Sequence, residues 1–129
     1  MPLVVDRTHL PELRLCYVGD FSDAELKVFL NDLEALLQVP GPKVCVIDLT
    51  HATTATARQR QLQAAWIRKN EAALARDFAA AAIVANNAIV RGTVTAIFWL
   101  RPLPFPTHVA STLASAEAWL APYRAAITP

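Results

Sequence analysis

Apolar positions recur along the chain with two periods, and these predict strands alternating with helices. Two short apolar runs, Leu3–Leu10 and Leu13–Val18, predict a pair of strands at the start. Between Ser22 and Pro40, leucines and one phenylalanine recur every three to four residues, which predicts a helix. Glu25 stands three places after Ser22, as in a capping box, so this helix has a defined beginning.

The remainder of the chain continues the alternation. The predicted elements are a strand over Lys43–Leu49, a helix from Thr56 to about Arg76, a strand over Ala79–Ala85, a helix over Ala88–Leu100, a short strand over Thr107–Ser111 and a helix from about Leu113. The strand that begins at Lys43 is apolar nearly throughout and is predicted to be central. The segment Ala88–Leu100 also alternates like a strand, but Asn86 and Asn87 are good helix caps and favour a helix.

This order, ββαβαβαβα, predicts the fold class. We expect an α/β protein with a single mixed, mostly parallel sheet of about five strands flanked by about four helices. Residues 1–129 are expected to form one domain, since no linker, repeat or low-complexity tract interrupts them. In the long helix that follows Thr56, the expected buried stripe includes Leu62, Ala65 and Trp66.

Composition excludes several classes of function. Twelve basic and eleven acidic side chains give a formal charge of +1, which provides no strong field for nucleic acid. The apolar runs are much shorter than the ~20 residues of a membrane span, and no secretory signal is expected. Cys16 and Cys45 lie within apolar strands and are expected to be buried free thiols, which indicates a cytoplasmic location.

The passage KVCVIDLTHATTATARQR, residues 43–60, contains the most conspicuous candidate chemistry. A strand there leads into a hydroxyl-rich turn that opens a helix, a place where α/β proteins often meet ligands. His51 lies near Asp48 and several threonines, but no nucleophile elbow accompanies them, so we expect no catalytic site. The three histidines are widely spaced and the few glycines form no phosphate loop, so neither a metal nor a cofactor is expected.

The chain resembles the STAS-like domains, which include anti-sigma-factor antagonists and have a branch related to CRAL-TRIO lipid-binding domains. The resemblance rests on the element order, on VIDLTHA at Val46–Ala52 and on THVASTLASAEAWL at Thr107–Leu120. It implies a SpoIIAA-like fold and a regulatory, non-enzymatic role. In the antagonists, an Asp-Ser pair at a helix start carries a phosphorylation switch, whereas here Thr56 and Ala57 occupy that place.

The strict phosphoserine of that family is therefore absent. Thr53, Thr54 and Thr56 remain candidate phosphorylation sites, because a helix N-terminus and nearby Arg58 or Arg60 would favour a phosphate. The alternative is that these threonines cap the helix and bind turn amides.

A second unusual segment is FWLRPLPFP, residues 98–106. If Trp99, Leu103 and Phe105 are exposed together, they would form an apolar docking surface bracketed by Arg91 and Arg101. The alternative is a rigid crossover that packs on the sheet.

Two functions follow from these features, with a hydrolase as a remote third. The first is partner binding, by a regulatory protein or by a second copy of the chain. The residues assigned to that surface are Thr50, His51, Thr53, Thr54, Thr56, Arg58, Trp99, Arg101, Leu103 and Phe105. The second is binding of a small apolar or lipid-like ligand between helix and sheet, with Trp66, Phe98 and Trp99 as its lining.

Overall fold

The computed structural model describes residues 2–53 and 55–128, and its centre is one five-stranded sheet with the strand order β1-β2-β3-β4-β5. The strands are β1 (Leu3–Asp6), β2 (Glu12–Gly19), β3 (Lys43–Ala52), β4 (Phe78–Val84) and β5 (Thr107–Ala110). The helices are α1 (Asp23–Leu36), α2 (Ala57–Lys69), α3 (Glu71–Asp77), α4 (Ala88–Leu100) and α5 (Leu113–Ile127). Only β1 runs antiparallel to its neighbour, so the sheet is mixed and mostly parallel, as predicted.

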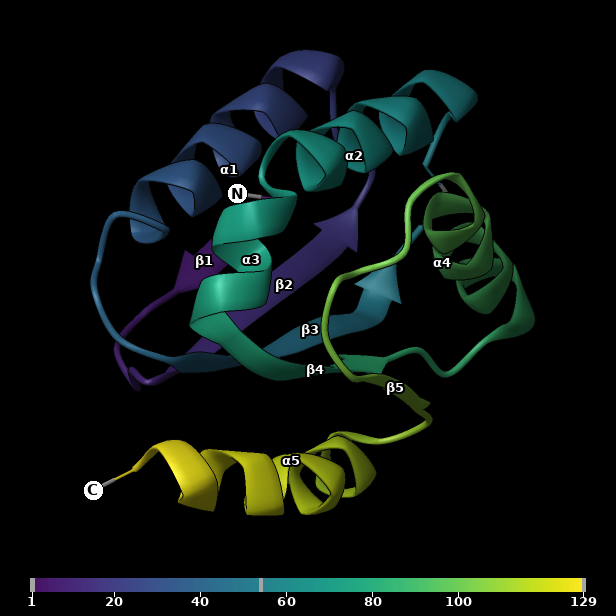
Figure 1. Ribbon diagram of the computed structural model, residues 1–129. Coiled ribbons are helices and arrows are strands. Elements are labelled where there is room, and N and C mark those ends of the chain that lie inside the picture. The colour runs from purple at the N-terminus through teal and green to yellow at the C-terminus, as the bar shows by residue number, and fades with distance from the viewer. Residues whose placement is uncertain (1, 54, 129) are drawn as a thin grey trace.

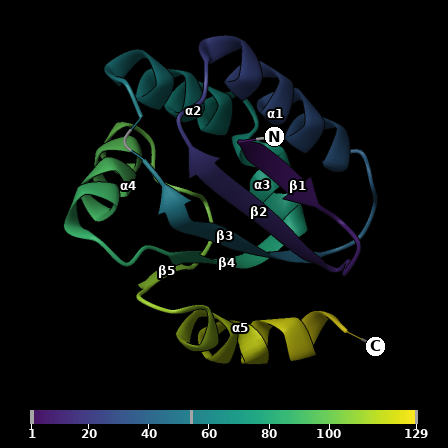
Figure 2. The ribbon, with the colours of Figure 1, turned by 180° about the vertical axis from the view of Figure 1, so that it is seen from behind.

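Four helices lie on one face of the sheet and one lies on the other (Figure 1). The connections from β2 to β5 always step to the next strand in the same direction. Because crossovers between parallel strands are almost always right-handed, such steps place all their helices on the same face. Helices α1, α2, α3 and α4 therefore share one face, here called the upper face, and α5 alone covers the lower face (Figures 1 and 2).

Local signals place the ends of several elements where the sequence predicted them. Ser22 caps α1: its hydroxyl accepts a hydrogen bond from the amide of Glu25, whose carboxylate accepts one from the amide of Ser22. Strand β3 occupies the centre of the sheet and is paired in parallel on both sides. β5 is a short edge strand, and α4 is a helix rather than a strand.

The long helix predicted from Thr56 to Arg76 is wrong in one respect, because it is two helices. Asn70 separates α2 from α3, and its side-chain amide donates to the carbonyl of Trp66 at 3.0 Å and to Glu34 of α1 at 3.2 Å. The asparagine side chain competes with the backbone for these hydrogen bonds, which favours a break in the helix. The part of the chain that the structure describes thus has five helices instead of about four.

Apolar packing and a network of ion pairs hold α5 against the lower face of the sheet. Ala116 and Leu120 of α5 are fully buried against the small, apolar residues of the central strands. Two arginines, Arg14 of β2 and Arg124 of α5, form ion pairs with both Glu12 and Glu117. This network joins α5 to β2. Within the described residues, no helix is both long enough and apolar enough to traverse a bilayer.

Candidate functional site

The carboxyl end of β3 and the turn after it are held by side-chain hydrogen bonds. The strand predicted over Lys43–Leu49 continues to Ala52, so Asp48, Thr50 and His51 lie in the strand itself. The carboxylate of Asp48 accepts a hydrogen bond from the amide of Thr50 at 2.9 Å and another from its hydroxyl at 2.6 Å. The hydroxyl of Thr53 donates to Asp20, which follows β2, at 2.5 Å. His51 is exposed, and no hydrogen bond joins it to Asp48 in the described part of the chain. Asp48 thus binds the backbone and side chain of its own strand, near the carboxyl end of β3.

The helix that follows begins with a complete capping box. Thr56 accepts a hydrogen bond from the amide of Gln59, and the Gln59 side chain accepts one from the amide of Thr56. Arg58 pairs with Asp23 at 2.8 Å, and the Arg60 guanidinium donates to the carbonyl of Ala55 at 2.7 Å. The predicted capping role of Thr56 is confirmed. Both arginines near the candidate phosphorylation sites already have partners.

The candidate residues of this turn lie together at the carboxyl ends of the parallel strands. Thr53 and Thr56 keep their hydroxyls in the hydrogen bonds given above, and Thr54 lies outside the described residues. Among the described residues, no group of three or more His, Cys, Asp or Glu side chains could hold a metal ion. The local geometry is therefore that of a hydrogen-bonded strand end and turn, with His51 exposed on the strand.

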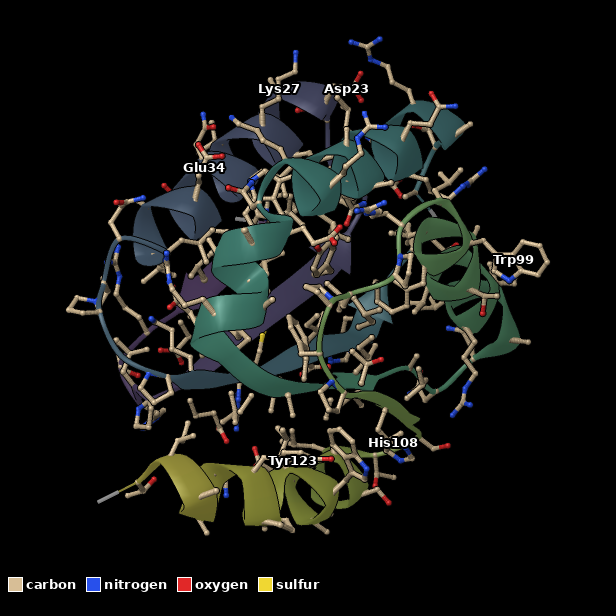
Figure 3. All side chains as sticks on the ribbon, in the orientation of Figure 1. Asp23, Lys27, Glu34, Trp99, His108 and Tyr123 are labelled. Carbon is tan, nitrogen blue, oxygen red and sulfur yellow. The ribbon has the colours of Figure 1, made fainter. Side chains whose placement is uncertain are left out.

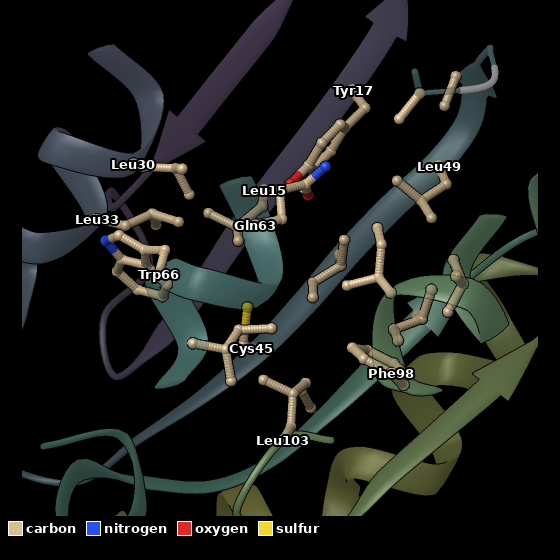
Figure 4. Close-up of a pocket in the computed structure, with 18 of the residues that line it drawn as sticks. Leu15, Tyr17, Leu30, Leu33, Cys45, Leu49, Gln63, Trp66, Phe98 and Leu103 are labelled. Carbon is tan, nitrogen blue, oxygen red and sulfur yellow. The ribbon is translucent and has the colours of Figure 1, made fainter. Parts of the chain in front are cut away.

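Beside this turn, the upper-face helices and the sheet line an apolar cavity of about 140 Å³ that is partly open to the surface (Figure 4). Its wall is formed by leucines of α1, by Trp66 and Ile67 of α2, by strand residues of β2, β3 and β4, and by the inner side of α4. Representative lining residues are Leu15, Leu33, Cys45, Leu49, Ala81, Val94, Ile97 and Phe98. No charged side chain lines it among the described residues. The cavity extends to Thr53 and Ala55, so it reaches the turn that follows β3.

The main polar groups in the wall bind one another. The Tyr17 hydroxyl donates to the side-chain carbonyl of Gln63 at 3.1 Å (Figure 4). The Gln63 amide donates to the backbone carbonyl of Gln59 at 3.4 Å, and the Gln59 amide donates to the carbonyl of Phe21 at 2.8 Å. Burial raises the pKa of Tyr17, so its phenol stays protonated. These bonds satisfy the side chains of Tyr17 and Gln63, so most of the wall that a guest would meet is apolar.

Of the three residues predicted to line an apolar site, Trp66 and Phe98 do so, whereas the prediction for Trp99 is wrong. Trp99 is 86% exposed and projects away from the body of the molecule (Figure 3). It follows Phe98 directly, and consecutive helical residues point in directions about 100° apart. The buried indole N–H of Trp66 has no hydrogen-bond partner in the described part of the chain and lies on the side of Leu33 (Figure 4).

The crossover after α4 packs inward, so the expected common surface of Trp99, Leu103 and Phe105 does not form. Leu103 and Phe105 are half-buried, line the cavity and pack against the upper-face core. The ring of Phe105 stacks on Phe78 with centroids 5.6 Å apart. Arg101, which was assigned to the same surface, forms an ion pair with Glu71 of α3. The proline-rich segment therefore forms part of the cavity wall.

The sequence reasoning missed most of the cavity wall, including Tyr17, Cys45, Gln63 and Ala81. One available signal was the spacing of Gln59 and Gln63, four residues apart on one face of a helix that otherwise buries apolar residues. The buried positions of α2 are Gln59, Gln63, Ala64 and Ile67, whereas Ala65, expected in the buried stripe, is exposed. The rest of the expected stripe is confirmed, because Leu62 and Trp66 pack against the upper-face core. Apolar character alone does not reveal the buried glutamines.

Comparison with solved structures identifies the class of fold. The chain is similar to the crystal structure of an uncharacterized protein of the DUF3478 family with a SpoIIAA-like fold, from Shewanella loihica PV-4. The two share 17% sequence identity with a TM-score of 0.66 over 92% of this chain and 91% of the other. The fold is therefore SpoIIAA-like, which confirms the resemblance to STAS-like domains. No protein-family model and no curated protein matches the sequence.

Proposed function

We propose that this chain is a non-enzymatic regulatory domain of the STAS type that binds one small, uncharged apolar molecule in its upper-face cavity. The observation that carries the proposal is the cavity itself, about 140 Å³ of space whose described wall contains no charged side chain. Native interiors are normally packed with few voids larger than a water molecule. A space of this size and chemistry suits an apolar guest better than water.

The volume indicates the size of the guest. An apolar cavity of roughly 150 Å³ accepts benzene or xenon, whereas pockets for larger ligands measure about 300–1,000 Å³. At about 140 Å³, this cavity fits a single aromatic ring or a short alkyl segment. A complete acyl chain would require α4 or the crossover after it to move outward.

A binding role rather than catalysis is supported by the state of the polar groups. Tyr17, Gln63 and Gln59 are joined in one chain of hydrogen bonds, which leaves no activated base in it. Burial raises the pKa of the Cys45 thiol well above its ordinary value, so this cysteine is a poor nucleophile. A wall of this kind can bind a small molecule, but these side chains provide neither an activated base nor a reactive nucleophile for catalysis.

The proposal is tested by titrating the protein with benzene or toluene and following backbone amide chemical shifts by NMR. Amides around Ala81, Val94 and Phe98 are expected to shift in a saturable manner. Ala81→Leu adds three carbon atoms within the cavity and is expected to weaken binding at least tenfold. Val94→Met fills the space from α4 and provides a second test if Ala81→Leu folds poorly.

The matched control is Ala118→Leu, the same substitution at an exposed position of α5, outside the cavity wall. It is expected to bind benzene like the parent chain. Benzoate, which carries a charge, is expected not to bind because the cavity offers no compensating partner. The proposal is contradicted if benzene and toluene cause no saturable shift, or if both filling variants bind them as well as the parent does.

A further inference from the structure

The outer face of α4 is an exposed apolar surface, and its large exposed side chains do not line the cavity. Trp99, Ile89 and Leu100 are 86%, 68% and 55% exposed, and Trp99 points directly away from the molecule (Figure 3). A helical wheel with 100° per residue puts these three on one arc, with Gly92 and Ala96 between them. Contiguous exposed apolar surface of this kind commonly marks an interface.

The same face carries no charge. Arg91 is the only charged residue of α4, and its guanidinium donates to the carbonyl of Ala85 at 2.9 Å and to the hydroxyl of Ser111 at 2.7 Å. It is thereby turned toward the ends of β4 and β5. Arg101, just beyond the helix, pairs with Glu71. An uncharged face offers no complement to an anionic membrane, an acidic peptide or a nucleic acid, but it does complement another uncharged face.

The face is complementary to itself. Ile89 lies five residues before Val94, and Trp99 lies five residues after it. Gly92 and Ala96 are likewise two residues before and two after the same point. In an antiparallel pair of α4 helices with the two-fold axis level with Val94, Ile89 of each copy would meet Trp99 of the other, and Gly92 would meet Ala96.

The centre of the face allows close approach of a second helix. A methyl group added at Gly92 would meet no atom within 4 Å outside the backbone of its own helix, so the space above this residue is open. Small residues at the centre let two helices approach while the large residues at both ends interlock. The polar side chains Asn87 and Arg101 lie just beyond the two ends of α4 and would form the rim.

We propose that a second copy of this chain covers the outer face of α4, giving a homodimer in which the two α4 helices pack antiparallel. The interface is independent of the ligand proposed for the cavity, because Ile89, Gly92, Ala96 and Trp99 do not line the cavity. Thirteen residues of helix span about 20 Å, so the interface is at the small end of the range for specific contacts. We expect a weak dimer, with a dissociation constant on the order of 100 μM.

The test uses a charge pair that only this geometry brings together. Ile89→Lys and Trp99→Glu are each expected to raise the dissociation constant at least about tenfold in sedimentation velocity, since each buries a charge against an apolar partner. Mixing the two variants should restore association. In the mixed dimer, Lys replaces Ile at one contact and faces the introduced Glu, while the other contact remains Ile with Trp.

Val28→Glu is the matched control, because Val28 is an exposed apolar residue on α1, away from α4. It is expected to dimerise like the parent chain, and circular dichroism of all variants checks that the fold is kept. Three results would overturn the proposal: a parent chain that stays monomeric at millimolar concentration, a Trp99→Glu dimer as tight as the parent, or single variants whose mixture fails to associate. Cosedimentation of such a monomer with neutral phosphatidylcholine vesicles would assign the face to lipid instead.

Discussion

At the scale of single residues, the side chains that look most reactive in the sequence form hydrogen bonds that stabilise the local backbone. Asp48 holds the amide and hydroxyl of Thr50, and Thr56 caps α2. Both are short polar side chains that bind the nearby backbone, which is why they are common at strand ends and helix starts. The residues that define the candidate site are instead apolar or internally hydrogen-bonded, such as Ala81 and Gln63.

The two cysteines give a test at this scale. Burial raises the pKa of both thiols, and for Cys16 the carboxylate of Asp48 raises it further. A raised pKa means less thiolate at a given pH, so alkylation of the folded protein should be slow. At pH 8 we expect Cys16 to react with iodoacetamide more slowly than glutathione, and Cys45 to react only when the chain unfolds. Mass spectrometry of the labelled peptides over time gives both rates.

Denaturation in urea provides the control, because both thiols should then react at the rate of glutathione. Equal fast labelling of the two cysteines in the folded protein would contradict the burial of Cys45 beneath the upper-face helices. It would also remove one argument that the cavity wall is chemically inert.

The roles of residues that act on the nearby backbone could be predicted from the sequence. Roles that depend on tertiary contacts could not. The capping functions of Ser22 and Thr56 follow from spacing alone, and both are confirmed. The burial of Gln63 could not be inferred in this way, because it depends on Tyr17, which lies 46 positions away in sequence. The outward direction of Trp99 depends equally on which side of α4 meets the sheet.

At the scale of elements, the helices cover the two faces of the sheet in different ways. Four helices share the upper face and leave a cavity beneath them, whereas α5 alone seals the lower face. Periodicity predicted most helices and strands correctly because each has a clear hydrophobic pattern. The break at Asn70 escaped prediction, since it is reinforced by a hydrogen bond to Glu34 of α1 that no local pattern reveals.

Because α5 is the helix that covers the lower face, truncation of its buried side chains should lower the stability of the protein. Leu120 is fully buried against the lower face, so Leu120→Ala should lower the free energy of unfolding by about 2–5 kcal/mol. Leu113→Ala removes the same atoms from an exposed position of the same helix and should cost less than about 1 kcal/mol. Urea denaturation followed by circular dichroism measures both.

Benzene binding by Leu120→Ala serves as a second readout, because Leu120 does not line the upper cavity. Its affinity should equal that of the parent chain while the protein remains folded. A loss of stability no greater than that of Leu113→Ala would show that α5 is not the essential cover of the lower face.

At the scale of the whole molecule, strand order, cavity and outer surface are connected through α4. Because the crossovers all step in one direction, α4 arrives at the end of the upper layer, with α2 as its main helical neighbour (Figure 1). Its inner side, with Val94 and Ile97, faces the cavity, and its outer side displays Trp99. One helix thus separates the proposed ligand from the proposed dimer interface.

A helix above a cavity lacks packing partners on part of its inner side and should open more readily than its neighbours. We therefore expect the amides of α4, from residue 92 to 100, to exchange with deuterium faster than those of β3 and β4 in the monomer. Ala81→Leu fills the cavity and should stabilise α4 by about 1 kcal/mol, which slows its exchange severalfold. Ala118→Leu, outside the cavity, should leave it unchanged. Hydrogen exchange with mass spectrometry at low protein concentration measures these rates without dimerisation. Protection of α4 equal to that of the central strands would mean that the cavity does not weaken its wall, and a guest could then enter only by another route.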